Sequence, residues 1–279
     1  MLPSYSEYIH GNKAIIPEGI TEIEADAFSG NEDIVSVEIP EGVAVIGRSA
    51  FAGCAALTDI VFPKSLRGFE DYAFADCFGL TSLAIDIQQD EPYMGTGVFM
   101  NCTGLNEVDV KGGYIGQDAF EGCTNLKRVV IEEGVRGIGR CAFAGCAALT
   151  DIVLPKSLRG FEDYAFADCL GLTSLAIDIQ QDEPYMGTGV FMNCTGLNEV
   201  DFKGGYIGQD AFKGCTNLKR AYIGEEVRRI GENAFGDCIN LEEVVIKGCD
   251  KEIQPGFIRG CPKLSTIVIS ADKPQATND

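Results

Sequence analysis

One short motif, Ala-Phe-x-x-Cys-x-x-Leu, recurs along the whole 279-residue chain. It contains eleven of the sixteen phenylalanines, and successive ones lie 21 to 25 residues apart. These phenylalanines are Phe28, Phe51, Phe74, Phe99, Phe120, Phe143, Phe166, Phe191, Phe212, Phe235 and Phe257. A period of this length is typical of solenoids, in which each repeat forms one coil and the coils stack. We therefore expect the phenylalanines to form a continuous buried spine.

The residues of one repeat predict what a coil contains. Leu57–Pro63 alternates apolar and polar positions as a half-buried strand does, and its proline ends the strand because proline has no N–H to donate. Leu66 and Phe69 start a return path, and Asp71–Cys77 has room for about one helical turn. One such coil cannot bury its own apolar face, so stacking is required.

The pattern V-x-x-I-G-x-x-A-F-x-x-C, clearest in residues 42–54 and 227–238, resembles the BspA-like leucine-rich repeat family. The resemblance covers residues 14–269, although Asn31 replaces the first cysteine and two repeats read Lys-Gly-Gly-Tyr where others have proline. It implies a single domain over residues 1–279 with about eleven repeats. The implied fold is an α/β solenoid, a right-handed leucine-rich-repeat superhelix with mostly parallel strands and short helical turns.

A larger duplication is superimposed on the repeats. Residues 48–128 recur at 140–220, and only five of the 81 aligned positions differ. The differing pairs are Ser49/Cys141, Phe62/Leu154, Phe78/Leu170, Val110/Phe202 and Glu121/Lys213. The offset spans four whole repeats, so the copying keeps the coils in register.

The charge of the chain excludes some partners. There are 42 acidic against 22 basic residues, a formal net charge of -20. Such a field repels nucleic acid and anionic membranes, and no apolar stretch reaches the roughly 18 residues that span a bilayer. We expect no nucleic-acid partner, no membrane insertion and no signal peptide at the start of this chain. The acidic surface either favours basic partners or is simply solvated.

Ten of the twelve cysteines occupy one inward position of the repeat. They are Cys54, Cys77, Cys102, Cys123, Cys146, Cys169, Cys194, Cys215, Cys238 and Cys261. A disulfide column and a metal column are alternatives, but parallel-stacked side chains point wrongly for disulfides, and the chain lacks C-x-x-C and has one histidine, His10. We interpret the column as buried thiols and expect no metal or cofactor. Cys141 and Cys249 lie off the column, and they are either reactive or, as we prefer, inert.

The sequence offers little for catalysis. With His10 as the only histidine, a nucleophile–histidine pair is not expected, and no carboxylate stands out as a catalytic acid. The glycine-rich segment Lys111–Gly116 lacks the Lys-Ser/Thr ending of a phosphate loop. We therefore predict no catalytic or cofactor-binding residues and no enzyme.

The outward-facing positions of the predicted strands form a candidate binding surface, which we name the sheet stripe. Acidic, small and valine residues dominate it, which favours a broad protein-binding surface over a sugar site with stacked aromatic rings. Alternatively, these residues are simply what a strand face is made of. Its candidate binding residues are Glu38, Asp59, Glu107, Asp109, Arg128, Asp151, Glu199, Asp201, Arg220, Tyr222 and Glu243.

Two longer coils form a second candidate surface. Ile87–Gly97 and its copy Ile179–Gly189 exceed the usual coil by two residues, and insertions in a repeat tend to loop outward. We predict exposed anchors in these loops, which the duplication would make bivalent, or else a harmless length variant. The anchors are Tyr93, Met94, Tyr185 and Met186.

The family resemblance implies a microbial cell-surface or secreted protein that takes part in adhesion and binds host or matrix proteins. We thus predict a non-enzymatic interaction module with a protein partner, and a monomer rather than an oligomer. The alternative is a structural spacer within a larger surface assembly.

Overall fold

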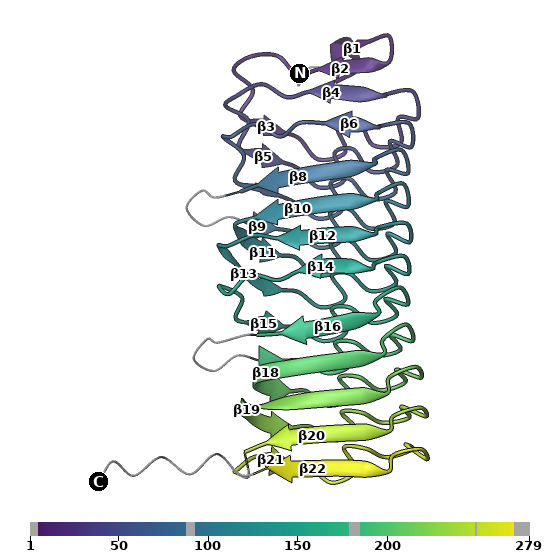
Figure 1. Ribbon diagram of the computed structural model, residues 1–279. Helices are drawn as coiled ribbons and strands as arrows, with labels where there is room; N and C mark the ends of the chain where they lie inside the picture. Colours follow the sequence, from purple (N-terminus) through teal and green to yellow (C-terminus); the bar gives the residue numbers. More distant parts are fainter. Residues whose placement is uncertain (1–4, 88–92, 179–184, 249, 271–279) are drawn as a thin grey trace, which may run out of the picture.

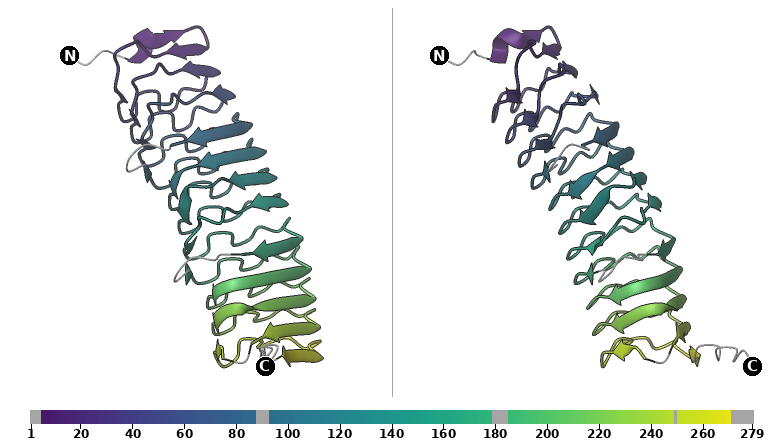
Figure 2. Two further views of the ribbon diagram at one scale, coloured as in Figure 1. Left: turned by 60° about the vertical axis from the view of Figure 1, so that its left-hand side comes forward. Right: turned by 90° about the vertical axis from the view of Figure 1, so that its left-hand side faces the viewer.

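The computed structural model describes residues 5–87, 93–178, 185–248 and 250–270. The coils stack into one elongated solenoid with the two termini at opposite ends (Figure 1, Figure 2). It has about eleven turns, parallel strands and almost no helix. The predicted leucine-rich-repeat solenoid is therefore confirmed, while its helical turns are not.

One strand of each coil lies on the same face, which we call the first ladder. Neighbouring strands pair in parallel, and equivalent residues of successive repeats lie side by side, as Glu107 does with Arg128 and Arg128 with Asp151. The ladder is interrupted after β6 and after β14, which are equivalent places in the two copies. Its strands are β2 (Lys13–Ile15), β4 (Ser36–Glu38), β6 (Asp59–Ile60), β8 (Ser82–Asp86), β10 (Glu107–Lys111), β12 (Arg128–Ile131), β14 (Asp151–Val153), β16 (Ser174–Ile177), β18 (Glu199–Ile207), β19 (Arg220–Ile230), β20 (Glu243–Lys247) and β22 (Thr266–Ser270).

The return path contains a second strand, which the sequence analysis did not predict. It forms the second ladder, to which the ends of β18 and β19 also belong, because these two strands continue from the first ladder into the second. The glycine after this strand permits the close stacking, since a Cβ on Gly47 would lie 2.7 Å from the carbonyl oxygen of Ile23. The remaining strands are β3 (Glu22–Ile23), β5 (Val45–Ile46), β7 (Gly68–Phe69), β9 (Tyr93–Met94), β11 (Gly113–Ile115), β13 (Val135–Ile138), β15 (Gly160–Phe161), β17 (Tyr185–Met186) and β21 (Glu252–Ile253).

The segment around each spine phenylalanine is a ladder of turns, and the prediction of a helical turn there is wrong. In the first repeat Asp26 and Gly30, on either side of Phe28, have left-handed φ angles of 58° and 72°. The N–H of Phe28 donates to Ala50 of the next coil at 2.7 Å, whereas the N–H of Asn31 donates to Phe28 within its own coil at 3.1 Å. A helix would keep all these donors within one coil, so the alternation excludes it.

The spine phenylalanines stack face to face through the centre of the solenoid. Ring centroids of successive residues from Phe28 to Phe235 lie 5.0 to 5.4 Å apart, and the planes are within 9° of parallel. Tyr5 packs edge-on against Phe28 and caps the stack. The predicted buried spine is confirmed for ten phenylalanines, while Phe257 in the last coil is only partly buried.

The cysteine column follows the spine as free thiols. Each Sγ donates to the carbonyl oxygen of the spine phenylalanine one coil earlier, at 3.1 to 3.3 Å. Burial raises the pKa of Cys54 to about 11 and that of Cys194 to about 12. The interpretation of the column as buried thiols is confirmed. Asn31 acts differently, because its Oδ1 accepts from the N–H groups of Asp33 and Ile34.

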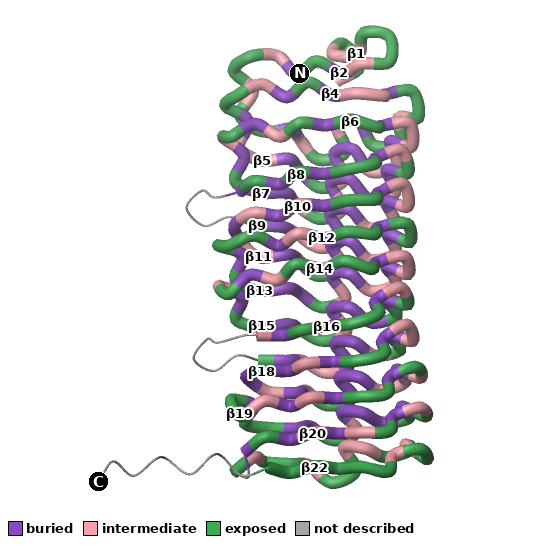
Figure 3. The backbone as a smooth tube through the Cα atoms, in the orientation of Figure 1, coloured by how far each residue is buried: buried purple, intermediate pink, exposed green. Residues whose placement is uncertain are grey.

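The two ends of the solenoid are built differently. At the N-terminal end η1 (Tyr5–Tyr8) and the antiparallel strand β1 (Ile9–His10) cover the first coil. At the C-terminal end all five residues of β22 are exposed, and the last coil is exposed or half-buried along most of its length (Figure 3).

Candidate functional site

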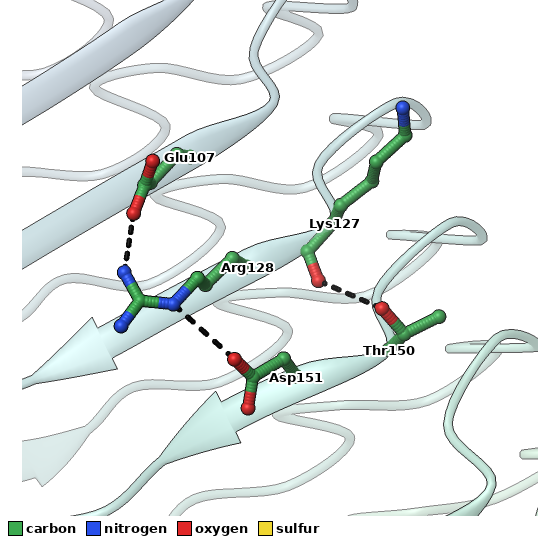
Figure 4. Close-up of polar contacts among 5 residues, drawn as sticks. All are labelled: Glu107, Lys127, Arg128, Thr150 and Asp151. Carbon is green, nitrogen blue, oxygen red and sulfur yellow. Dashed lines mark hydrogen bonds and ion pairs between the residues drawn. The ribbon is translucent and has the colours of Figure 1, made fainter.

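The sheet stripe lies on the outer side of the first ladder, where alternate strand residues point away from the core. At its centre Arg128 extends between two acidic residues on the neighbouring strands (Figure 4). Its guanidinium pairs with Glu107 on one side and, through Nε, with Asp151 at 3.2 Å on the other. All three side chains remain about half exposed. The structure thus brings three predicted site residues together as a charged triad.

Four coils further on, the equivalent residues are Glu199, Arg220 and Glu243. They occupy the same register, and Nε of Arg220 lies 3.7 Å from Glu243. Glu243 lies beyond the duplicated block and stands where the first triad has Asp151. The register and the order of charges are therefore repeated, with an ion pair on the Glu243 side, although Glu243 was not copied.

The other stripe residues are more scattered. Glu38 pairs with Lys13 at 2.6 Å, and Asp59 lies exposed where the first ladder is interrupted. Three others are half-buried two residues further along the strands of the triad residues: Asp109, Asp201 and Tyr222. Asp201 is directly beside Tyr222 in the register. These residues line the same face but do not join the charged triads.

The predicted loop anchors lie in strands of the second ladder, where the tyrosines are exposed and the methionines are buried. Tyr93 and Tyr185 are 41% and 42% exposed, whereas Met94 and Met186 are 6% and 8% exposed and belong to the core. The prediction of exposed methionines is wrong, because successive residues of β9 and β17 point to opposite sides and each methionine aligns with a buried residue, such as Phe69. The loop tips, residues 88–92 and 179–184, lie outside the described residues.

The exposed tyrosines belong to a column that was not predicted from the sequence. Tyr114 and Tyr206 occupy the corresponding positions of the next coils, on β11 and β18, which contact β9 and β17 respectively. A Cβ on Gly68 would lie 2.7 Å from the ring of Tyr93, and one on Gly160 would lie 2.8 Å from that of Tyr185. The rings therefore lie across glycines of the preceding coil. Aligning Gly-Gly-Tyr-Ile with Glu-Pro-Tyr-Met, both of which precede the spine motif, could have found this column.

Tyr114 leans in the other direction, across Gly137, where a Cβ would lie 2.6 Å from its ring. A Cβ on Gly137 would also lie 3.4 Å from the hydroxyl of Tyr185. The side chains of Tyr114 and Tyr185 therefore approach each other above Gly137 and Gly160, the glycines of the two coils between them. Burial, followed by the nearby Glu162, raises the pKa of both tyrosines. These phenols are therefore neutral at physiological pH.

Beside Tyr185 and Tyr206 the second ladder is hollowed into a groove of about 530 Å³. Arg229 and Glu252, which follow Tyr206 in the register of the second ladder, also line it, and their Nε and Oε1 atoms are 3.7 Å apart. Gln254 also lines the groove and donates to Glu252 at 2.6 Å. The groove combines aromatic rings with a connected set of charged and amide groups.

Other chemistry is sparse in the described part of the chain. No group of three or more His, Cys, Asp or Glu residues there is placed to hold a metal ion, and no helix there is long and apolar enough to cross a membrane. Cys141 lies half-buried in the ladder of turns, and burial, Asp118 and Glu121 raise the pKa of its thiol. Cys249 lies outside the described residues.

Comparison with known proteins gives a consistent result. The family model described as BspA type leucine rich repeat region matches residues 5–114, 113–206 and 186–277. The crystal structure of a leucine-rich repeat protein from Bacteroides ovatus is similar, with 23% identity, a TM-score of 0.59, and coverage of 92% of this chain and 78% of that chain. The T. pallidum leucine rich repeat protein has 30% identity over 58% of this chain and 78% of its own, with a TM-score of 0.52. The pneumococcal vaccine antigen PcpA has 18% identity over 93% and 79%, with a TM-score of 0.50. No curated protein matches the sequence.

Proposed function

Because this chain belongs to the BspA-type leucine-rich-repeat family, we propose that it is a non-enzymatic protein-interaction or adhesion module. The sheet stripe is its principal binding surface, and the partner is a protein, such as a host or matrix protein. Stacked repeats of this kind present long continuous surfaces, which suit binding to extended epitopes better than enclosing a substrate. We assign no catalytic residue and no cofactor.

The observation that carries this proposal is the charged triad of Glu107, Arg128 and Asp151, whose charge pattern and register recur four coils on at Glu199, Arg220 and Glu243. Ion pairs at such exposed positions contribute little to folding stability. Across an interface, however, a fixed pattern of positive and negative groups steers the partner and sets its register. A rigid triad on an exposed ladder therefore serves recognition better than stability.

A structural spacer is the second candidate. Residues 48–128 and 140–220 are copies separated by whole coils, so the duplication lengthens the solenoid without disturbing its stacking. That is the change expected if length itself were selected. The spacer function predicts that surface substitutions are tolerated while removal of four coils is not.

We also propose a location at the cell surface or in the secreted fraction, as expected from the family. Free cysteines are uncommon in oxidising compartments, since exposed thiols form disulfides there. In this chain nine of the ten column cysteines are buried, and each of the ten donates to a backbone carbonyl. Their burial makes the reduced column compatible with such a location.

The test is a capture experiment with matched variants. Partners are captured from host extracellular extract and from the lysate of the source organism, and binding is then measured on immobilised protein. The double variant Arg128→Ser with Arg220→Ser replaces both arginines by serine. Serine occupies the equivalent position of the first ladder in three other coils, at Ser36, Ser82 and Ser174. We expect this double variant to weaken binding at least about tenfold, since each arginine is a central charged anchor.

The control is Lys213→Glu, which introduces in the second copy the residue of the first and lies in the ladder of turns. It should leave binding unchanged. If the double arginine variant binds as well as wild type, the sheet stripe is not the binding surface. If it does so while a four-coil deletion abolishes function in the cell, the spacer function is supported.

A further inference from the structure

We propose that the groove beside Tyr185 and Tyr206 is a binding site for a neutral carbohydrate. The site is separate from the sheet stripe, because its residues come from the second ladder, on β17, β18, β19 and β21. Its volume of about 530 Å³ lies within the range of sites for small ligands, roughly 300 to 1,000 Å³. It accommodates a short segment of a glycan chain.

The tyrosines supply the apolar part of such a site. Tyr185 is 42% exposed, and its ring is held across Gly160, so one face is supported by backbone while the rest remains accessible. Sugar rings carry C–H groups on one face, and these pack against aromatic rings that present a large rigid area at low entropic cost. Tyr206, one coil further on, supplies a second aromatic side chain to the same groove.

Arg229, Glu252 and Gln254 supply the polar part of the site. Glu252 accepts from Gln254 at 2.6 Å and pairs with Arg229 at 3.7 Å, so its carboxylate is oriented before a ligand arrives. Arginine provides several donors in a fixed plane, a carboxylate provides several acceptors, and an amide provides both. Sugar hydroxyl groups donate and accept at once, and adjacent pairs of them fit such planar groups. The network therefore suits hydroxyl groups better than a single charge.

The charge of the site selects among carbohydrates. Glu232 and Glu252 line the groove against one arginine, and the chain as a whole carries a net charge of -20. Acidic glycans such as polyuronates are repelled by this field. A basic peptide is attracted by it, but Arg229 within the wall opposes a second cation. A neutral glycan meets neither obstacle.

The first copy provides a natural comparison for this site. Tyr93 and Tyr114 form the same tyrosine pair, but they are followed by Gly137 and Gly160 where the second pair is followed by Arg229 and Glu252. Those glycines have no side chains with which to build the polar wall. The inference therefore predicts one carbohydrate site, at the second pair only.

The test is isothermal titration of the full chain with a panel of oligosaccharides. The neutral probes are maltohexaose, cellohexaose, β-1,4-mannohexaose and N-acetylchitohexaose, and the charged probes are hexagalacturonate and hexalysine. We expect at least one neutral probe to bind with a dissociation constant below about 1 mM and one site per chain. Hexagalacturonate should not bind.

Matched variants locate the binding. Tyr185→Ala should weaken it at least about tenfold, whereas Tyr185→Phe, which keeps the ring, should change it little. Tyr93→Ala removes the equivalent ring from the first copy, and should cost similar stability while leaving binding intact. Arg229→Gly places after the second copy the residue that follows the first copy, and it should abolish binding. Arg128→Ser should not affect it, so this test is independent of the proposed function.

Three outcomes would overturn the inference. One is that no neutral probe binds at concentrations up to about 10 mM. Another is that Tyr93→Ala weakens binding as much as Tyr185→Ala. The third is that hexalysine binds at the groove in place of the neutral probes, which would reassign it to a basic peptide.

Discussion

The two copies of the duplicated block are almost the same sequence, yet the surfaces that they complete are different. Both contain a tyrosine pair on the second ladder, Tyr93 with Tyr114 and Tyr185 with Tyr206. The coils that follow add Gly137 and Gly160 in one case, and Arg229 and Glu252 in the other. Each surface feature of a solenoid is shared between neighbouring coils. A copied block therefore acquires a new site from its new neighbours, without substitutions of its own.

The five differences between the copies support this interpretation, because none lies in the sheet stripe or the tyrosine column. Val110/Phe202 is a buried pair, and Phe62/Leu154 is partly buried. Phe78/Leu170 is exposed in both copies, and Ser49/Cys141 and Glu121/Lys213 lie in the ladder of turns. The copies have diverged in packing, in one exposed apolar residue and in local charge, while the sheet stripe and the tyrosine column are unchanged.

The strongest test of the equivalence of the copies is removal of a spine phenylalanine from each. Phe51 and Phe143 are equivalent, fully buried, and stacked between neighbours at 5.0 to 5.1 Å. Phe51→Ala and Phe143→Ala should each cost about 3–5 kcal/mol of unfolding free energy, the penalty for emptying a large core site. Urea unfolding of the two variants measures the costs.

The control is Phe257→Ala in the last coil, where the side chain is only partly buried and no stacked partner follows it. It should cost clearly less. A large difference between Phe51→Ala and Phe143→Ala would show that identical coils contribute unequally in their two positions. Negligible costs for both would show that the stacked spine is not the core.

The next test addresses the coils that follow the two tyrosine pairs. Gly137→Ala should destabilise the protein by about 1–3 kcal/mol, because its Cβ would lie 2.6 Å from the ring of Tyr114 and must displace it. Arg229→Ala, at the equivalent position after the second copy, should have a small effect on stability. Adding Tyr114→Ala should abolish the cost of Gly137→Ala, which a double-mutant cycle measures. Additive costs would show that the ring does not lie across the glycine.

Much of the fold could be predicted from the repeat. The spacing of the phenylalanines predicts the stacked spine, and the alternation in Leu57–Pro63 predicts the first ladder. The second ladder is too short for such a pattern, since β5 and β7 contain two residues each. The ladder of turns depends on left-handed residues such as Tyr72 and Cys141, which are not types that signal this conformation.

The candidate sites were predictable to different extents. The sheet stripe follows from alternation within strands, so Glu107, Arg128 and Asp151 could be placed on one face before their ion pairs were seen. The methionines were wrongly predicted to be exposed, because the two extra residues of the long coils obscure the sequence pattern of the strands β9 and β17. The groove was missed because its walls come from separate coils, and because Arg229 and Glu252 stand where the other copy has glycine.

A smaller test exchanges the charge that distinguishes the copies. Lys213 pairs with Asp210 at 3.5 Å, whereas Glu121 stands at the equivalent place beside Asp118. Lys213→Glu should lower stability by about 0.5 kcal/mol, and Glu121→Lys should raise it by a similar amount. Both changes are measured by urea unfolding at low salt, since salt screens exposed charges.

The same pair predicts a pH dependence. Burial and then Asp118 raise the pKa of Glu121 above its ordinary value of 4.5. Above this raised pKa the ionised carboxylate of Glu121 destabilises the folded state, because the carboxylate is less favourable in the folded protein than in the unfolded chain. The advantage of Glu121→Lys should therefore be complete at neutral pH and should shrink as the pH falls through the raised pKa. An advantage that is constant with pH would exclude the charge explanation.

The smallest difference between the copies concerns reactivity rather than stability. Cys141 is half-buried where the first copy has Ser49, while its neighbours in the cysteine column are buried with raised pKa values. The pKa of Cys141 is itself raised by burial, Asp118 and Glu121, so its thiolate is scarce at neutral pH. We expect alkylation of native protein to be slow at neutral pH and to accelerate with rising pH.

Cys141→Ser should remove one reacting group without changing stability, while in denaturant most of the twelve cysteines should react. Mass spectrometry of the alkylated peptides assigns each site. Rapid labelling of column cysteines such as Cys146 before Cys141 would show that the coils open locally, and would contradict the buried column.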